Sequence, residues 1–260
     1  MPRLFLNRTY AVGETLALEA DPAHYLRDVL RLRVGDGFTA VLPDGREAQV
    51  RLTRVDAAGV AGQVTSLQAA APAPAVRLSL YAALLKREAF EWLIQKTTEV
   101  GVAEIVPVLT ERSVVRPRAD RLAAQEERWN KIAQAAGAQC QAPSVPPVRE
   151  PLAWEEALAR WQGQGCAGLV FTIPGRGEPA AELSGLLTDL PPGDELALFL
   201  GPEGDFAPRE MEQARAAGLR PAGLGHRILR AETAAVVATA LCLYELGRAS
   251  ASRNREEDHG

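Results

Sequence analysis

The sequence has few of the residues that build metal or disulfide sites. Its 260 residues include three cysteines and three histidines. Cys140, Cys166 and Cys242 form no C-x-x-C pair, and the histidines have no metal-ligand spacing. We therefore expect buried cysteines that behave as small hydrophobic side chains, and neither a metal site nor a disulfide framework.

Several other sequence signals are missing. No apolar run reaches the roughly 18 residues that span a bilayer, and the apolar core of residues 1–8 is too short for a secretory signal. No G-x-G-x-x-G follows a predicted strand, and there is no P-loop lysine. No Ser-His-Asp set or paired-carboxylate pattern is recognisable. We expect a cytoplasmic globular protein that is neither a dinucleotide-binding nor a P-loop enzyme.

Lysine is almost absent: Lys86, Lys96 and Lys131 are the only ones, and the net charge is −4. Arginine replaces lysine throughout, so the number of arginines is poor evidence for RNA binding. Their clustering is better evidence. One cluster lies within residues 27–33 and another within 112–121. Each cluster fits a solvated surface as well as a track of phosphate contacts.

Residues 1–70 have the pattern of a small β-barrel. Apolar and polar positions alternate between turn signals, and Pro43-Asp44-Gly45 separates two such runs. Proline presets φ and glycine accepts the left-handed conformation, so these three residues predict a hairpin turn. Residues 68–75 carry two prolines and few side chains to bury, which is typical of a linker.

From residue 75 to 248 strands alternate with helices, which predicts an α/β fold with a parallel sheet covered on both faces. Strands are expected at 77–83, 104–109, 167–172 and 195–200, and helices at 88–100, 120–137, 152–161, 208–217 and 232–247. Ligands of such sheets bind beyond the carboxyl ends of the strands. The polar residues 249–260 are expected to be a disordered tail.

Two glycine-bearing segments close this region: LALFLGPEGDF at 196–206 and GLGHRILRAETAAVVATALCLYEL at 223–246. Glycine lets the backbone approach a ligand closely, so these two strand ends, together with Phe171-Thr-Ile-Pro174, are candidates for one pocket. Four further motifs precede them, at 24–31, 91–101, 110–115 and 128–133.

With these motifs in this order, the chain resembles the ribosomal RNA small-subunit methyltransferase E family, of the SPOUT class of S-adenosylmethionine-dependent methyltransferases. The resemblance implies a deep trefoil knot in the C-terminal parallel sheet, an N-terminal PUA-like β-barrel and a homodimer. It also implies methylation of N3 of a specific uridine in 16S ribosomal RNA. Knots are so rare that general connection rules would argue against one.

The resemblance assigns site residues to this chain. Those expected to bind the cofactor are Thr172, Leu200, Gly201, Pro202, Glu203, Gly204, Leu224, Gly225, Ile228, Leu229 and Arg230. Those expected to bind RNA are Arg3, His24, Arg27, Arg31, Lys86, Arg112 and Arg116.

Catalysis is expected to rest on Arg230, with Arg227 as the alternative. A uracil N3 must lose its proton to become a good nucleophile, and a fixed guanidinium can stabilise the resulting anion. Arg230 can equally form a salt bridge to Glu232. Glu203 or Glu232 can accept the imide proton, but a carboxylate at a helix start can also be a cap or dipole partner. The proton can also leave directly to solvent.

Alternative interpretations stay open at this point. The chain can be a non-catalytic RNA-binding assembly factor, or a SPOUT methyltransferase of another RNA such as transfer RNA. The apolar stripe of Ala234, Val237, Leu241 and Tyr244 can face a partner subunit or cover the chain's own sheet. Asp205 departs from the family, which usually has a second glycine there, and Ala138 and Ala142 replace an expected Glu and Arg.

Overall fold

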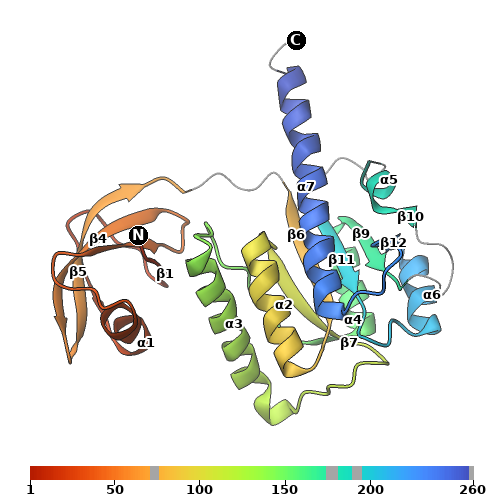
Figure 1. The fold of residues 1–260 in the computed structure, drawn as a ribbon, viewed down its shortest axis with the longest axis horizontal. Helices are drawn as coiled ribbons and strands as arrows, with labels where there is room; N and C mark the ends of the chain where they lie inside the picture. The colour runs from red at the N-terminus through yellow and green to blue at the C-terminus, as the bar shows by residue number, and fades with distance from the viewer. Residues whose placement is uncertain (71–75, 174–180, 189–194, 258–260) are drawn as a thin grey trace. The chain divides into compact units, whose positions relative to one another are not determined.

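The computed structural model describes residues 1–70, 76–173, 181–188 and 195–257 (Figure 1). Its contacts divide the chain into two compact units. Unit 1 contains Met1–Ala73 together with Gln134–Val145, and unit 2 contains Pro74–Ala133 and Pro146–Gly260. The sequence did not anticipate that residues 134–145 group with the N-terminal strands. Most of the linker predicted over 68–75 lies outside the described residues.

Unit 1 is built on a curled five-stranded sheet, a half-barrel (Figure 1). Its strands, in the sheet order β1-β3-β4-β5-β2, are β1 (Arg3–Phe5), β3 (Gly37–Val41), β4 (Glu47–Asp56), β5 (Gly59–Gln68) and β2 (Thr15–Leu18). All pairs are antiparallel except β1 and β3. Helix α1 (Ala20–His24) continues as a π-helical turn, η1 (Tyr25–Val29).

The predicted hairpin turn is confirmed between β3 and β4. Gly45 has a φ of 80°, and the Leu42 N–H donates to the carbonyl of Arg46 at 2.9 Å. The alternating pattern places Phe38, Ala40 and Val50 inside, where they are fully buried with Leu26 of η1. The period of two thus explains why this sheet has one apolar face.

Residues 134–145 attach to β1 through Arg3. The Arg3 guanidinium donates to the carbonyls of Gln141, at 2.8 Å, and Ala142, at 2.6 Å. It also pairs with Glu47 of β4, and its side chain is only 10% exposed. The side-chain amide of Gln134 adds a hydrogen bond to the Phe5 carbonyl. Arg3 therefore joins three separate segments of unit 1.

Unit 2 contains a seven-stranded parallel sheet, which confirms the predicted α/β class. In sheet order its strands are β10 (Ala181–Glu182), β12 (Arg220–Gly223), β9 (Ala167–Phe171), β11 (Glu195–Leu200), β6 (Arg77–Ala83), β7 (Glu104–Leu109) and β8 (Leu152–Ala153).

Helices cover both faces of this sheet. Helices α2 (Arg87–Val100) and α7 (Ala231–Glu257) lie side by side over one face (Figure 1). Helices α4 (Trp154–Gln164) and α6 (Pro208–Ala217) pack against the other face. The remaining helices are η2 (Ala119–Arg121), α3 (Leu122–Gln139) and α5 (Leu183–Thr188). Helix α7 includes the backbone of residues 249–257, where the sequence predicts a disordered tail.

Aromatic stacking fixes the centre of the sheet. Tyr81 of β6 and Phe199 of β11 are register partners, and their rings stack with centroids 4.4 Å apart at an interplanar angle of 8°. Trp154 and Trp161 of α4 meet the Phe199 ring edge-on, each at 5.9 Å. These pairs add about 0.5–1.5 kcal/mol each beyond area burial. They hold β11, and therefore the loop that follows Leu200, in a fixed position.

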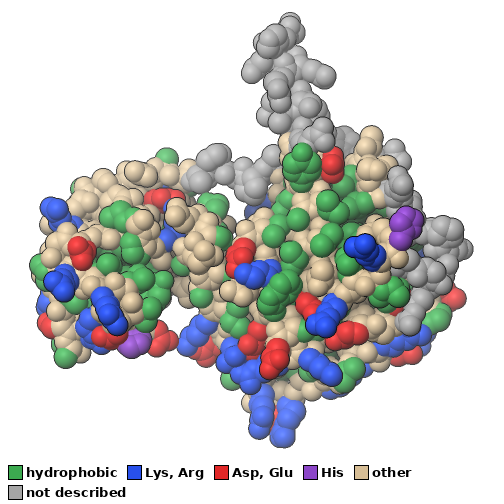
Figure 2. All heavy atoms as spheres, in the orientation of Figure 1, with side chains coloured by type: hydrophobic (Ala, Val, Ile, Leu, Met, Phe, Trp, Pro, Cys, Tyr) green, Lys and Arg blue, Asp and Glu red, His purple; other side chains and the backbone are tan. Residues whose placement is uncertain are grey.

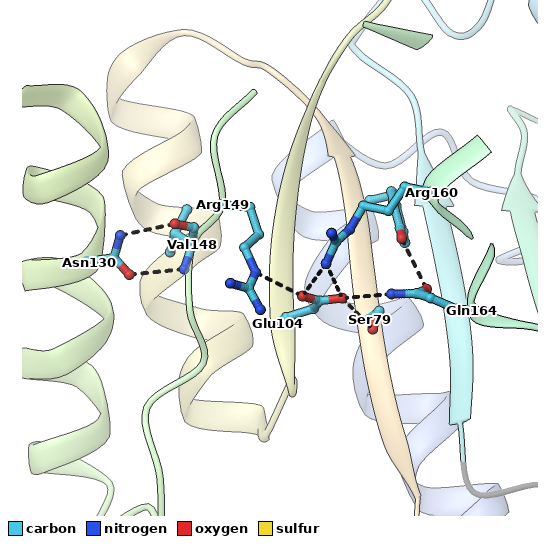
Figure 3. A network of polar contacts seen from close by, with 8 residues as sticks. Ser79, Glu104, Asn130, Val148, Arg149, Arg160 and Gln164 are labelled. Carbon is cyan, nitrogen blue, oxygen red and sulfur yellow. Dashed lines mark hydrogen bonds and ion pairs between the residues drawn. The ribbon is translucent and has the colours of Figure 1, made fainter. Parts of the chain in front are cut away.

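A buried carboxylate connects several segments at the amino end of strand β7 (Figure 3). Glu104 begins β7, and its side chain is 10% exposed. It accepts hydrogen bonds from Ser79, Arg149, Arg160 and Gln164. Burial raises the pKa of Glu104, but the hydrogen bond from Arg149, the charge of Arg160 and the hydrogen bond from Gln164 outweigh it, so the pKa is lowered.

Replacing Glu104 with Gln is expected to lower the free energy of unfolding by about 1–3 kcal/mol, because the two arginines lose their negative partner and one of the two acceptor oxygens becomes a donor. Arg149 and Arg160 are 50% and 38% exposed, which favours the lower end of that range. The folded-state pKa lies below the ordinary value of 4.5, so the stabilisation is present above that value and is lost as the pH falls through the folded-state pKa.

Urea unfolding at neutral and acidic pH measures both effects. Glu195→Gln is the matched control, because Glu195 is half exposed and pairs only loosely with Arg77, at 3.4 Å. It should change stability by less than about 0.5 kcal/mol. An equal effect of the two substitutions at neutral pH would contradict the role given to Glu104.

Candidate functional site

Three adjacent strands of unit 2, β12, β9 and β11, end at one edge of the sheet. The described residues that follow these strand ends, together with the first turn of α7, line an open pocket of about 530 Å³, solvent-facing space included. The lining residues are Phe171, Thr172, Ile173, Leu200, Gly201, Pro202, Glu203, Asp205, Leu224, Arg227, Ile228, Leu229, Ala231 and Ala234.

Two glycines are required where these strands end. A Cβ at Gly201 would lie 3.2 Å from the ring of Phe206 and 3.3 Å from its backbone nitrogen, closer than ordinary packing allows. Gly225 has a φ of 89°, which side-chain-bearing residues rarely adopt. Gly201 thus allows Phe206 to pack closely against the end of β11, and Gly225 allows the chain to turn after β12.

The side chains of Arg112 and Glu210 hold the loop after β11 in place through hydrogen bonds. Arg112 donates from Nη1 to the carbonyls of Gly204, at 2.8 Å, and Phe206, at 3.3 Å. The buried carboxylate of Glu210 accepts from the Glu111 N–H at 2.7 Å and the Ala207 N–H at 2.8 Å. Glu210 thus supplies the cap that Ala207, which has no side-chain oxygen, cannot supply at the start of α6. Hydrogen bonds of Glu111 and Arg112 therefore connect the segment after β7 to the loop after β11 and to the start of α6.

Asp205 is a buried acidic residue of this loop that lines the pocket. It has a φ of 64° and is 6% exposed. Its Oδ2 accepts from the Ile173 N–H at 3.2 Å, and its Oδ1 accepts from the Phe206 N–H at 2.9 Å. The side chain therefore connects the end of β9 to the loop after β11.

The structure brings most of the predicted cofactor residues together. Eight of the eleven line the pocket: Thr172, Leu200, Gly201, Pro202, Glu203, Leu224, Ile228 and Leu229. Gly204, Gly225 and Arg230 flank it without lining it. Phe171 and Ile173, which belong to a strand end expected at the pocket, also line it, as does Asp205, which follows Gly204. The sequence did not indicate that Ala231 and Ala234 line the pocket, and their place in the first turn of α7 was the available signal.

The three predicted catalytic residues are placed differently. Arg227 lines the pocket and is exposed. Arg230 precedes α7, is exposed, and its carbonyl accepts the Ala234 N–H at 2.8 Å. Glu232 lies half-buried in the first turn of α7. Within the described residues no ion pair joins Arg230 to Glu232, so the salt bridge considered from the sequence is not formed.

Two predicted RNA contacts of unit 1 share one carboxylate. Arg27 donates to Asp28 from Nε, at 3.0 Å, and Nη2, at 2.7 Å, and to the Asp56 carbonyl at 2.8 Å. His24 Nδ1 lies 2.6 Å from Asp28 Oδ2. The hydrogen bond from Arg27, helped by that from His24 and opposed by partial desolvation, lowers the pKa of Asp28 to about 2. Asp28 therefore offsets part of the positive charge of this motif.

Among the other predicted RNA contacts, three arginines bind groups of the protein itself, and two cations are exposed to solvent. Arg3 is nearly buried among its intramolecular partners, so its position gives no support to a phosphate contact. Arg112 is engaged with the pocket loop, and Arg116 donates to the Thr110 carbonyl at 2.9 Å. Lys86, which precedes α2, and Arg31, which has a φ of 56°, are exposed.

Helix α7 has two apolar stripes. One is buried against the sheet and contains Ala231, Ala235, Ala238 and Cys242. The other is the stripe considered from the sequence. Its members Leu241 and Tyr244 are 43% and 63% exposed, and Ala234 and Val237 are half-buried. Hydrophobic side chains gather on the face that Figure 2 shows over α2 and α7, and Trp92 of α2 is 41% exposed.

Two kinds of site are missing from the part of the chain that the structure describes. No three His, Cys, Asp or Glu side chains come together in a way that could hold a metal ion. Among the same residues, none of the helices combines the length and apolar character needed to cross a bilayer.

Comparisons with known proteins match both parts of the chain. The family described as RNA methyltransferase domain matches residues 72–243, and the one described as RNA methyltransferase PUA domain matches residues 18–61. Ribosomal RNA small subunit methyltransferase E of Synechocystis sp. is 33% identical over 92% of this chain and 76% of its own length. That of Bacillus subtilis is 29% identical over 94% and 97%.

A solved structure is also similar. The enzyme of the same name from Neisseria gonorrhoeae, bound to S-adenosylmethionine, superposes with a TM-score of 0.82 and 29% identity. The match covers 93% of this chain and 96% of that one.

Proposed function

Because the chain belongs to the ribosomal RNA small subunit methyltransferase E family, we propose that it transfers a methyl group from S-adenosylmethionine to N3 of a specific uridine in 16S ribosomal RNA. The observation that carries this proposal is the pocket formed by the ends of β12, β9 and β11 and the start of α7. Ligands of parallel sheets bind at such an edge.

The residues of the pocket fit this cofactor. Leu200, Leu224, Ile228 and Leu229 supply apolar walls, and the glycine turns expose backbone groups that can hydrogen-bond to a nucleoside. Carboxylates at Glu203 and Asp205 suit the positive charge that the cofactor carries. The bound cofactor would supply an activated methyl group on a sulfonium, so the protein needs to provide orientation and electrostatics only.

The chain's part in the chemistry is to stabilise the uracil anion that forms when the N3 proton leaves. Arg227 lines the pocket and presents fixed guanidinium donors. Arg230 lies three residues further along, at the start of α7, and is the other candidate. Stabilising an anion in a desolvated site speeds its attack on a cationic donor. Glu203 or Glu232 is proposed to accept the proton, with transfer to solvent as the alternative.

RNA binding is proposed to rest on unit 1 and on the exposed cations Arg31 and Lys86. Phosphate contacts position an RNA without identifying its sequence. The predicted trefoil knot and homodimer are parts of the same proposal. The exposed apolar stripe of α7, with Leu241 and Tyr244, supports a subunit interface there. A ribosomal substrate also supports the predicted cytoplasmic location.

The Arg27→Ala, Arg31→Ala double variant is expected to bind RNA more weakly and with a flatter salt dependence. Each lost phosphate contact lowers the slope of log K against log salt by about 0.7–0.9. Arg31 should contribute more than Arg27, because Arg27 is already paired with Asp28. Filter binding over a salt series measures the slope, and calorimetry should give an unchanged cofactor affinity.

Arg54→Ala is the control for that experiment, since Arg54 is an exposed arginine of unit 1 outside the predicted contacts. An identical slope for the control and the double variant would place RNA recognition elsewhere.

Methyl transfer from labelled cofactor tests the proposed substrate. Label should enter 16S RNA, either naked or in small subunits that lack the modification. Transfer RNA and large-subunit RNA should stay unlabelled. Label in transfer RNA would favour the alternative SPOUT activity, and no label in any RNA, despite cofactor binding, would favour a non-catalytic assembly factor.

A further inference from the structure

The carboxylate of Asp205 lies at the pocket and takes no part in the proton transfer or anion stabilisation proposed above. Its backbone is in the left-handed region, with a φ of 64°, where glycine is favoured. Aspartate tolerates this conformation better than most residues because its short side chain hydrogen-bonds locally. The Phe206 N–H, 2.9 Å from Oδ1, supplies that local bond. The side chain is therefore held in one place at a conformational cost.

Its second oxygen reaches across to another strand. Oδ2 accepts from the N–H of Ile173, two residues beyond the end of β9, at 3.2 Å. Both residues line the pocket. An ionised carboxylate is an acceptor only, and here each oxygen meets an N–H donor. Because the residue is only 6% exposed, its charge is poorly screened by water.

We propose that Asp205 is a specificity-determining residue: its negative charge makes this pocket bind the cationic cofactor more tightly than the neutral product. The proposal rests on the proposed function. When the methyl group leaves the sulfonium, the bonding electron pair stays on sulfur, and a positively charged ligand becomes a neutral thioether. A fixed negative charge therefore attracts S-adenosylmethionine but gains nothing comparable from S-adenosylhomocysteine. This difference helps fresh cofactor to replace product.

Other charges near the pocket do not give the same effect. Without bound RNA, Glu203 and Arg227 are exposed, so water screens their charges. The Arg112 guanidinium is held by the carbonyls of Gly204 and Phe206, on either side of Asp205. It is present in the wild type and in every variant below, so it cancels from a comparison of two ligands.

Calorimetry with both ligands tests the proposal in the wild type, Asp205→Asn and Asp205→Gly. The ratio of the Kd of S-adenosylhomocysteine to that of S-adenosylmethionine is the readout. Removing a poorly screened negative charge from the lining of the pocket should lower this ratio by about fivefold or more. Asp205→Asn keeps the size of the side chain, and Asp205→Gly relieves the left-handed backbone, so at least one variant should fold.

Glu195→Gln is the matched control, because it removes one carboxylate from the amino end of β11, the end opposite the pocket. Its ratio should equal that of the wild type. A merely structural role of Asp205 would weaken both ligands equally and leave the ratio unchanged, which would overturn the proposal. If the wild type binds neither ligand, the proposed function itself fails, and this outcome is distinct from an unchanged ratio.

Discussion

Gly201→Val is expected to weaken S-adenosylmethionine binding by about 100-fold, which corresponds to about 2.8 kcal/mol. Even the first added carbon would lie 3.2 Å from the Phe206 ring, and the ring cannot retreat easily because Phe206 is buried against Trp154. Overpacking of this kind typically costs 1–3 kcal/mol. The loop after β11 would have to shift, and this loop carries Pro202, Glu203 and Asp205 of the pocket.

Calorimetry measures the affinity, and thermal unfolding shows that the variant is folded. Gly163→Ala is the control: Gly163 lies in α4, and a Cβ there meets nothing within 4 Å. It should leave cofactor affinity unchanged. A folded Gly201→Val variant that binds with wild-type affinity would show that the pocket is not the cofactor site.

Alanine substitution of Arg227 is expected to lower kcat by about 100- to 1,000-fold, the usual cost of removing one donor to a developing anion. The Kd for S-adenosylmethionine should change only a few-fold, because the interaction is made mainly as the anion forms. Arg230→Ala should have the smaller effect of the two, since Arg230 does not line the pocket. Arg227→Lys should recover little, because a point charge replaces a planar fork.

Single-turnover methylation separates the chemical step from binding for these variants. Arg209→Ala, which removes an exposed arginine from α6, is the control and should turn over normally. If both Arg227→Ala and Arg230→Ala methylate at the wild-type rate, the anion is stabilised by other groups. A larger loss at Arg230 would instead support the assignment that the sequence favours.

Much of unit 2 is predictable from local sequence. Several of its strands are continuous apolar runs, such as Leu196–Leu200, and several of its helices end at glycines such as Gly101. Hydrophobic periodicity and these glycines therefore predict where most of the elements begin and end. The pocket was also predictable, because glycine turns after neighbouring parallel strands meet at one edge. The eleven individual cofactor residues were given by the family resemblance, and eight of them line the pocket.

Long-range contacts were not predictable. Nothing in the local pattern of residues 134–145 indicates that Arg3 binds their carbonyls. Arg112 looks like a surface cation in the sequence, yet it holds the carbonyl of Gly204, 92 residues away. The roles of these arginines depend on which backbone carbonyls the fold places beside them. Charge clustering alone therefore overstates the number of free RNA contacts.

Nucleoside analysis of the methylated RNA tests the central claim most directly. Small subunits lacking the modification are incubated with the protein and labelled S-adenosylmethionine, and their 16S RNA is digested to nucleosides. The account predicts that the label appears in 3-methyluridine at a single position, and that Gly201→Val abolishes it. Label in a ribose methyl group, in another base or at a carbon of uracil would contradict it.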